Sequence, residues 1–205
     1  MILTIPNNTK ALLLDLGGVI LQLKLQATFT AFEALGCHHF NTYFDSYSGA
    51  PFIESYEEGK ITNEAFVQEV LTTCYPGTTI EQVHIAWNAM LGTIPQATIT
   101  YLAQLSTQYK LILYSNTNAL HVAYLTQYYN QAFGMCTFQN LFTHIYYSHI
   151  LGIRKPHASG FVTILEQQQL MPNQVYYIDD GVQHIATATT LGIPNRLWLQ
   201  NDILG

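Results

Sequence analysis

Four short apolar runs, each leading to a polar residue, constrain the fold of this chain more than any other feature of its sequence. The runs span residues 11–14, 111–114, 144–147 and 175–178, and the polar residues are Asp15, Ser115, Lys155 and Asp179. Short unbroken apolar runs are typical of strands that are buried on both faces of a parallel sheet. Ligands of such sheets bind beyond the carboxyl ends of the strands, so we expect these polar residues to gather at one edge.

Helical stretches at residues 96–109, 118–129 and 159–169 alternate with these runs, which predicts a doubly wound α/β domain. The stretch between Lys24 and Ala89 breaks the alternation and predicts helices at residues 26–35, 52–58, 63–73 and 80–90. Thr62 is the expected N-cap of the third of these helices. We therefore expect a core domain of residues 1–23 and 90–205, with a small helical cap of residues 24–89 inserted after the first strand.

The composition limits the classes of partner and compartment. Hydrophobic residues make up 49% of the 205 residues and charged residues 10%, which favours a folded globule over disorder. The formal net charge is -6 with only seven Lys and Arg, so nucleic acid is not an expected partner. No apolar stretch approaches the length of a membrane span. Cys37, Cys74 and Cys136 form no C-x-x-C pair, which predicts free thiols and a cytoplasmic location.

Acidic residues follow two of the predicted strands. Asp15 precedes Leu16-Gly17-Gly18, where the glycines allow backbone amides to approach a bound anion, although a plain turn aspartate is the alternative. Asp179 and Asp180 would repel each other unless a cation or hydrogen bonds held them. Paired oxygen ligands of this kind suit Mg²⁺, although an acidic pair at a helix N-terminus would also explain them.

Two further segments could hold an anion at the same edge. Ser115-Asn116-Thr117-Asn118 ends a strand and opens a helix, so its polar groups point where an anion can bind. A simple cluster of N-capping residues is the alternative. Lys155 directly precedes Pro156, which we expect in the first turn of a helix, so Lys155 is predicted to face this edge. The alternative for Lys155 is an idle, solvated surface lysine.

Together these segments resemble the four ordered motifs of haloacid dehalogenase (HAD)-superfamily hydrolases. The matching segments are Asp15-Leu16-Gly17-Gly18-Val19, Ser115-Asn116-Thr117, Arg154-Lys155-Pro156 and Ile178-Asp179-Asp180. Each motif is short, but their order, spacing and strand context agree over nearly the whole chain. The cap segment at residues 58–66 is similar to that of small-capped sugar-phosphate phosphatases, the branch that includes bacterial glucose-1-phosphatase-like proteins.

The resemblance implies a role for each residue at the predicted edge. Asp15 is the implied nucleophile, which forms an aspartyl-phosphate, and Lys155 neutralises both Asp15 and the phosphate. Ser115 and Asn116 are implied to hold the phosphoryl oxygens, with Leu16 beside them. Mg²⁺ is the implied cofactor, and its implied ligands are Asp15, Asp179, Asp180 and the backbone carbonyl of Gly17.

Three positions depart from the family pattern. Gly17 replaces a usual second aspartate that serves as general acid and base, a replacement that also occurs in the branch this chain resembles. His157 replaces a frequent acidic residue, and His184 replaces a common asparagine. Without a carboxylate at position 17, a poor leaving group has no obvious proton donor. We therefore expect substrates with good leaving groups, such as a sugar 1-phosphate, to react best.

The sequence thus predicts a Mg²⁺-dependent phosphomonoesterase that acts on a small phosphorylated metabolite. One alternative is a haloacid dehalogenase, which also lacks the second aspartate but needs no metal. Another is a catalytically silent binding protein with the HAD fold. The intact set of Asp15, Ser115, Lys155 and Asp179 favours the phosphatase. The sequence leaves the oligomeric state and the identity of the substrate open.

Overall fold

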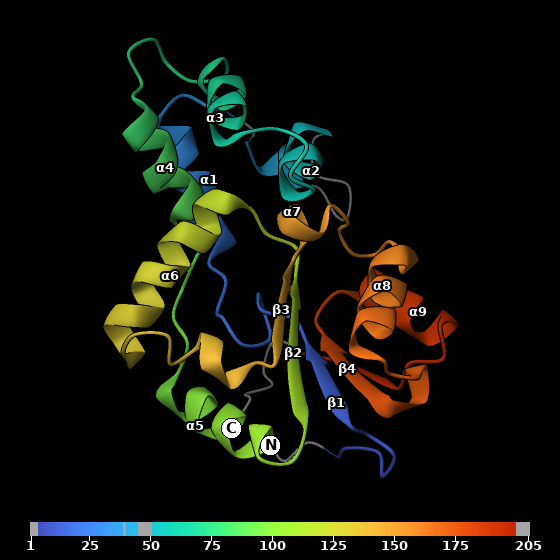
Figure 1. Cartoon of the computed structure of the whole chain (residues 1–205). Helices are drawn as coiled ribbons and strands as arrows, with labels where there is room; N and C mark the ends of the chain where they lie inside the picture. The colour runs from blue at the N-terminus through green and yellow to red at the C-terminus, as the bar shows by residue number, and fades with distance from the viewer. Residues whose placement is uncertain (1–3, 39, 45–50, 200–205) are drawn as a thin grey trace.

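The computed structural model describes residues 4–38, 40–44 and 51–199, and it confirms the predicted doubly wound α/β fold (Figure 1). Within these residues five parallel strands form one sheet in the order β3-β2-β1-β4-β5. The strands are β1 (Ala11–Leu14), β2 (Lys110–Ser115), β3 (His144–Tyr147), β4 (Val175–Asp179) and β5 (Asn195–Leu197). Since β1 pairs with both β2 and β4, Asp15 emerges between the ends of these two strands.

Helices cover both faces of the sheet, which explains why the run that forms β1 is apolar throughout. The helices of the core are α5 (Gln96–Ser106), α6 (Ala119–Phe133), α7 (Ser148–Leu151), α8 (Ala158–Gln168) and α9 (Val182–Thr190), with short 3-10 helices at Gln139–Leu141 and Pro172–Gln174. Leu12 and Leu14 pack with the buried residues of α5 and α6, whereas Leu13 packs with Phe161 of α8. Both faces of β1 are therefore buried, as in other parallel sheets.

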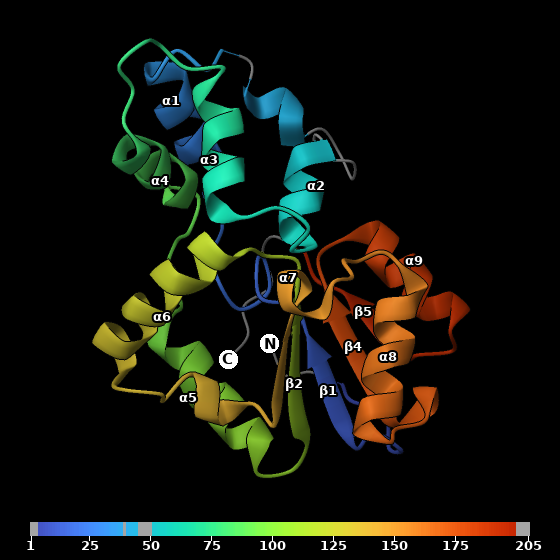
Figure 2. The same ribbon diagram turned by 45° about the horizontal axis from the view of Figure 1, so that its top comes forward.

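The segment between β1 and α5 is helical, as predicted, and lies beyond the carboxyl edge of the sheet (Figures 1 and 2). It contains α1 (Leu25–Ala34), the 3-10 helix η1 (Phe40–Phe44), α2 (Pro51–Glu57), α3 (Asn63–Leu71) and α4 (Ile80–Asn88). Thr62 is the N-cap of α3, as expected, because its hydroxyl accepts a hydrogen bond from the backbone N–H of Ala65 at 3.2 Å. No helix in the described part of the chain is long and apolar enough to span a membrane.

An aromatic cluster forms the interior of these helices. Phe66 of α3 is fully buried, stacks on Tyr56 of α2 at a ring distance of 4.2 Å, and packs against Trp87 of α4 at 4.7 Å. This cluster is separate from the two clusters that flank the sheet. The helical segment thus has a hydrophobic core of its own, which is a property of a domain.

The two connections between the helical segment and the sheet run side by side. Gln22 N donates to Thr93 O at 3.1 Å, and Lys24 N donates to Met90 O at 2.7 Å. A side chain at Gly92 would clash, since its Cβ would lie 2.6 Å from Gln22 O. This pairing supports our proposed division into a core of residues 1–23 and 90–205 and a cap of residues 24–89. Residues 1–3, 39, 45–50 and 200–205 of these ranges lie outside the described residues.

The structure adds elements that the sequence did not predict. β5 was missed because Asn195–Leu197 is short and only partly buried, so it carries no apolar run. Both α9 and the single-turn α7 were also missed. The first turn of α8 was placed wrongly, since α8 begins at Ala158 with His157 as its N-cap residue, and Pro156 precedes both.

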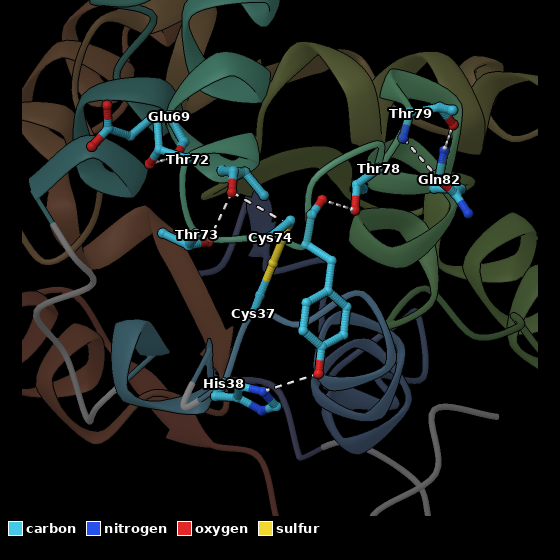
Figure 3. Close-up of a disulfide and its surroundings, with 11 residues drawn as sticks. Cys37, His38, Glu69, Thr72, Thr73, Cys74, Thr78, Thr79 and Gln82 are labelled. Atoms are coloured by element: carbon cyan, nitrogen blue, oxygen red, sulfur yellow. Dashed lines mark hydrogen bonds between the residues drawn. A yellow bond between two sulfur atoms is a disulfide. The ribbon is translucent and has the colours of Figure 1, made fainter.

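The prediction of free thiols is wrong for two of the three cysteines. Cys37 and Cys74 form a disulfide across 37 residues, whereas Cys136 is free and exposed (Figure 3). The cap fold brings the turn after α1 against the end of α3, where Tyr75 N also donates to Leu35 O at 2.8 Å. Sequence spacing could not show this contact. The thiols therefore no longer argue for a reducing compartment, and the cytoplasmic location stays a prediction.

The aromatic cluster should stabilise the cap. We expect Phe66→Ala to lower the free energy of unfolding by about 3–5 kcal/mol, because removing a buried ring leaves a cavity. Ile85→Ala on the exposed face of α4 is the control, with an expected change below about 0.5 kcal/mol. Urea unfolding followed by tryptophan fluorescence measures both. Equal stabilities of the two variants would contradict a stabilising role for the cluster.

Candidate active site

The carboxyl edge of the sheet brings together the polar residues that the sequence singled out. Asp15 follows β1, Ser115 ends β2 and Asp179 ends β4. Asp15 N donates to Ile178 O at 3.0 Å, so the backbone hydrogen bonding between β1 and β4 continues as far as Asp15. Lys155 enters from the loop between α7 and α8. Figure 2 shows α7 between cap helix α2 and the ends of the strands, so the cap covers this edge.

Lys155 joins two of the carboxylates. Its Nζ lies 2.6 Å from Asp15 Oδ1 and 2.5 Å from Asp179 Oδ2, and the side chain is 1% exposed. Asn116 fixes the backbone of Lys155, because its side-chain nitrogen donates to Lys155 O at 2.9 Å and its Oδ1 accepts from Lys155 N at 2.8 Å. The lysine is therefore held at both its backbone and its ammonium group.

The charges of this cluster shift the pKa of every member. Burial opposes the charged form of Lys155, but the carboxylates of Asp15 and Asp179 outweigh it and raise the pKa of the lysine. Burial has the largest effect on Asp15 and raises its pKa. The negative charges of Asp179 and Asp180 raise this pKa further, whereas Lys155 lowers it. Asp15 can attack an electrophile only when it is ionised. The protein alone thus leaves its carboxylate short of positive charge.

Asp179 is fully buried, and each of its carboxylate oxygens accepts two hydrogen bonds. Oδ1 accepts from Gly181 N at 2.7 Å and from His184 Nδ1 at 2.8 Å, whereas Oδ2 accepts from Lys155 and from the hydroxyl of Tyr177. Burial would raise the pKa of Asp179, but Lys155 and His184 hold it well below its usual value. Most of the acceptor capacity of Asp179 is therefore in use.

Asp180 presents a more accessible carboxylate beside it. Burial and the charge of Asp179 raise the pKa of Asp180, although its side chain reaches solvent. Carboxylate oxygens of Asp15, Asp179 and Asp180 lie within 4.8 Å of one another. An all-oxygen set with mutual repulsion fits a hard divalent cation such as Mg²⁺. Asp180 is better placed than Asp179 to be a direct ligand, because fewer of its oxygens are occupied.

The tight turn after β1 requires the second of the two glycines in the motif. Leu16 O accepts from Leu21 N at 2.7 Å, and Gly18 N donates to Leu21 O at 2.9 Å. Gly18 has a φ of +77°, and a Cβ there would overlap Asp180 Oδ2, so only glycine fits. At Gly17 a Cβ would lie 2.9 Å from Leu23 Cδ1, the end of a flexible side chain. Since the Leu16 side chain is buried, its backbone N–H is the group that could face an anion.

Ser115 and Asn116 differ in how free their side chains are. Ser115 is buried at the end of β2, and its hydroxyl makes a long contact of 3.4 Å with Asn116 O. The side chain of Asn116 holds Lys155, as described above, so its implied contact with phosphate would come mainly from its backbone N–H. The next residue is also fixed, because Ser148 Oγ accepts from Thr117 N at 2.9 Å.

Tyr177 and His184 support the site but were not predicted to do so. Tyr177 lies two residues before Asp179, so both side chains point to the same face of β4, and this spacing is the signal that could have identified it. His184 appeared only as a departure from a motif, yet its ring donates a hydrogen bond to Asp179. The contact between Ser148 and Thr117 left no signal in the sequence.

Solved structures and characterised proteins share this architecture. The chain is 25% identical over 183 residues, 89% of this chain and 88% of the relative, to a D-ribitol-5-phosphate phosphatase from Bacteroides thetaiotaomicron. A HAD-family enzyme from the same organism, crystallised with magnesium and inorganic phosphate, is 26% identical with a TM-score of 0.85 over 95% of this chain and 96% of that one. An L-2-haloacid dehalogenase from Xanthobacter autotrophicus, 13% identical, shares the fold with a TM-score of 0.58 over 91% and 76% of the two chains.

The family itself follows from the sequence match that accompanies this geometry. The sequence model of the haloacid dehalogenase-like hydrolases matches residues 9–192, which include the turn after β1, the end of β2, the Lys155 loop and the acidic loop after β4. The chain belongs to the haloacid dehalogenase-like hydrolase family, and it is a hydrolase.

Proposed function

We propose that this enzyme is a Mg²⁺-dependent phosphomonoesterase of a small phosphorylated metabolite. The observation that carries the proposal is the bridge from Lys155 to Asp15 and Asp179 beside the accessible carboxylate of Asp180. A carboxylate that attacks an anionic phosphate needs positive charge around it. The magnesium and phosphate in a similar solved structure, and the phosphatase activity in the name of a sequence relative, support the same chemistry here.

Asp15 is the proposed nucleophile. Its carboxylate oxygen attacks phosphorus, the bond from phosphorus to the leaving oxygen breaks, and an aspartyl-phosphate forms. Water then attacks the same phosphorus, the bond to the Asp15 oxygen breaks, and inorganic phosphate leaves. Lys155 lowers the pKa of Asp15 against the effect of burial and offsets phosphoryl charge, while Ser115 and the backbone N–H groups of Leu16 and Asn116 hold phosphoryl oxygens. Mg²⁺ would be held by Asp15, Asp179, Asp180 and the Gly17 carbonyl, and would supply Lewis-acid charge.

The geometry of the site also argues against the two alternatives, a metal-independent dehalogenase and a silent binding protein. A dehalogenase that needs no metal has no use for a second, accessible carboxylate at Asp180, and the likeness to a dehalogenase extends to the fold alone. A silent binding protein would not require Lys155 to be fixed by both Asn116 and the carboxylates. His184, which departs from the motif, donates to Asp179 and so supports the loop that carries both carboxylates.

Gly17 bears on the choice of substrate. A side-chain acid at this position would protonate the leaving oxygen, and glycine cannot do so. We therefore keep a sugar 1-phosphate as a proposed substrate, because its leaving hydroxyl is more acidic than a primary alcohol. The relative that acts on D-ribitol 5-phosphate cleaves a primary alkyl phosphate, which makes that compound the natural competitor.

Loss of the nucleophile should abolish turnover. We expect Asp15→Asn to release phosphate from p-nitrophenyl phosphate roughly 10⁴-fold or more slowly than the wild type. The exchange keeps the shape of the side chain and removes the attacking charge. Circular dichroism and thermal unfolding of the variant check that the fold is intact. Unchanged phosphate release would rule out Asp15 as the nucleophile.

Metal binding should depend on pH and on Asp180. Because the pKa values of Asp15 and Asp180 are raised, protons compete with Mg²⁺, and affinity should increase as the pH rises from acid to neutral. Asp180→Asn should weaken Mg²⁺ binding by at least about tenfold, since even outer-shell partners contribute 10–100-fold. Titration calorimetry measures both effects, with exposed Glu81→Gln as the control. Full activity in EDTA would favour the dehalogenase alternative.

The leaving group should govern substrate preference. We expect a higher kcat/KM for glucose 1-phosphate than for glucose 6-phosphate or D-ribitol 5-phosphate, by up to the roughly 10²–10⁴-fold that positioned acid catalysis contributes. Gly17→Asp should help the two alkyl phosphates most, provided that Leu23 moves away from the new side chain. Equal values, or a preference for either alkyl phosphate, would show that the argument from Gly17 is wrong.

A further inference from the structure

The cap touches the core on two sides through contacts of different kinds (Figure 2). On the side of α4 and α6, Trp87 Nε1 donates to Asn118 Oδ1 at 3.2 Å, and His121 lies 3.1 Å from Trp87 O through Nε2. The rings of Trp87 and His121 stack at 4.8 Å. All three residues are buried, and the paired connections between Gln22–Lys24 and Met90–Thr93 join the cap at α1 and α4, so α4 takes part in both contacts.

This first side is neutral and its polar groups are paired. Burial lowers the pKa of His121 to about 4, so the ring is uncharged at neutral pH. Its Nε2–H then donates to Trp87 O, and its Nδ1 accepts from the side-chain nitrogen of Asn118 at 3.2 Å. Opening this side would expose Trp87 and leave buried polar groups without partners, which is costly.

The second side contains the charged contacts between the cap and the core, beside a neutral hydrogen bond from Leu120 N to the hydroxyl of Tyr56 of α2 at 3.3 Å. Arg154 NH1 lies 2.7 Å from Glu54 Oε1, and its Nε and NH2 each lie 3.1 Å from Glu57 Oε2. Both glutamates belong to cap helix α2, whereas Arg154 belongs to the core. The exposed fractions of the Arg154, Glu54 and Glu57 side chains are 14%, 35% and 17%. A guanidinium shared between two carboxylates in a half-buried setting contributes more than a solvated surface pair.

Arg154 is also the residue next to Lys155. Asn116, Asp15 and Asp179 fix Lys155, so the neighbouring backbone that carries the Arg154 side chain is held in place at the catalytic edge. The contacts of Arg154 with Glu54 and Glu57 therefore tie the position of α2 to the position of Lys155. Unlike the neutral side, this contact can separate into water, where both kinds of charged group regain hydration.

We propose that Arg154, Glu54 and Glu57 form a cap latch, in which Arg154 is a positioning residue that holds α2 closed over Asp15 and Lys155. The side of Trp87, Asn118 and His121 stays joined while the latch opens and closes. The latch itself is a claim about the cap, and only its effect on turnover rests on the proposed phosphatase function.

Hydrogen–deuterium exchange of the whole, substrate-free protein tests the latch without reference to activity. Arg154→Gln and the double variant Glu54→Gln/Glu57→Gln should each speed exchange of the α2 amides by roughly tenfold, and leave those of β1 unchanged. Combining all three changes should add little to either variant, because each of them already removes both contacts of the guanidinium. Lys60→Gln is the matched control, since it breaks an ion pair with Glu58, 2.6 Å long, that lies within the cap.

Kinetics with a phosphorylated sugar, glucose 1-phosphate, separate the latch from a direct effect on Lys155. Arg154→Gln and the Glu54→Gln/Glu57→Gln variant should raise KM by a similar factor, and Arg154→Lys should restore part of the loss. A defect in Arg154→Gln that is absent from the glutamate double variant, in exchange and in KM alike, would overturn the latch. Faster exchange at α2 in a protein without phosphatase activity would support the latch and reject the proposed function instead.

Discussion

The ammonium group of Lys155 allows the buried carboxylates of Asp15 and Asp179 to share one edge of the sheet. Charges this deep in a protein persist only when they are paired and hydrogen-bonded. Lys155 meets both conditions, because Asp15 and Asp179 accept from its Nζ and Asn116 fixes its backbone. The ends of β1, β2 and β4 and the loop before α8 therefore depend on one another. A shift of any one of these segments would leave a buried charge without its partner.

The sheet could be predicted because strands that are buried on both faces appear in the sequence as unbroken apolar runs. Ala11–Leu14 and Val175–Asp179 are apolar up to their last residues, and in the structure every residue of both strands is buried. Asn195–Leu197 forms an outer strand that is only partly buried, so its sequence contains no apolar run. The disulfide between Cys37 and Cys74 depends on how α1 and α3 pack inside the cap, and sequence spacing does not report that packing.

The site shows the same division between what a sequence can and cannot reveal. Polar residues at strand ends converge because parallel strands share an edge, so the sequence alone is enough to group Asp15, Ser115 and Asp179. Their supporting hydrogen bonds could not be foreseen. Asn116 faces Lys155 across 39 residues, and His184 reaches Asp179 only after the loop turns into α9. Such partners depend on side-chain direction, which motif order does not encode.

The charge of the finished site explains why a divalent cation belongs there. Asp15, Asp179 and Asp180 bring three negative charges and Lys155 one positive charge, so the ionised cluster carries two negative charges. Arg154 cannot offset them, since Glu54 and Glu57 already occupy its guanidinium. A phosphate dianion would be repelled by such a site. Burial raises the pKa values of Asp15 and Asp180, and the neighbouring carboxylates raise them further. One Mg²⁺ ion, as we propose for this site, would balance the charge and would allow Asp15 to stay ionised while an anionic substrate approached it.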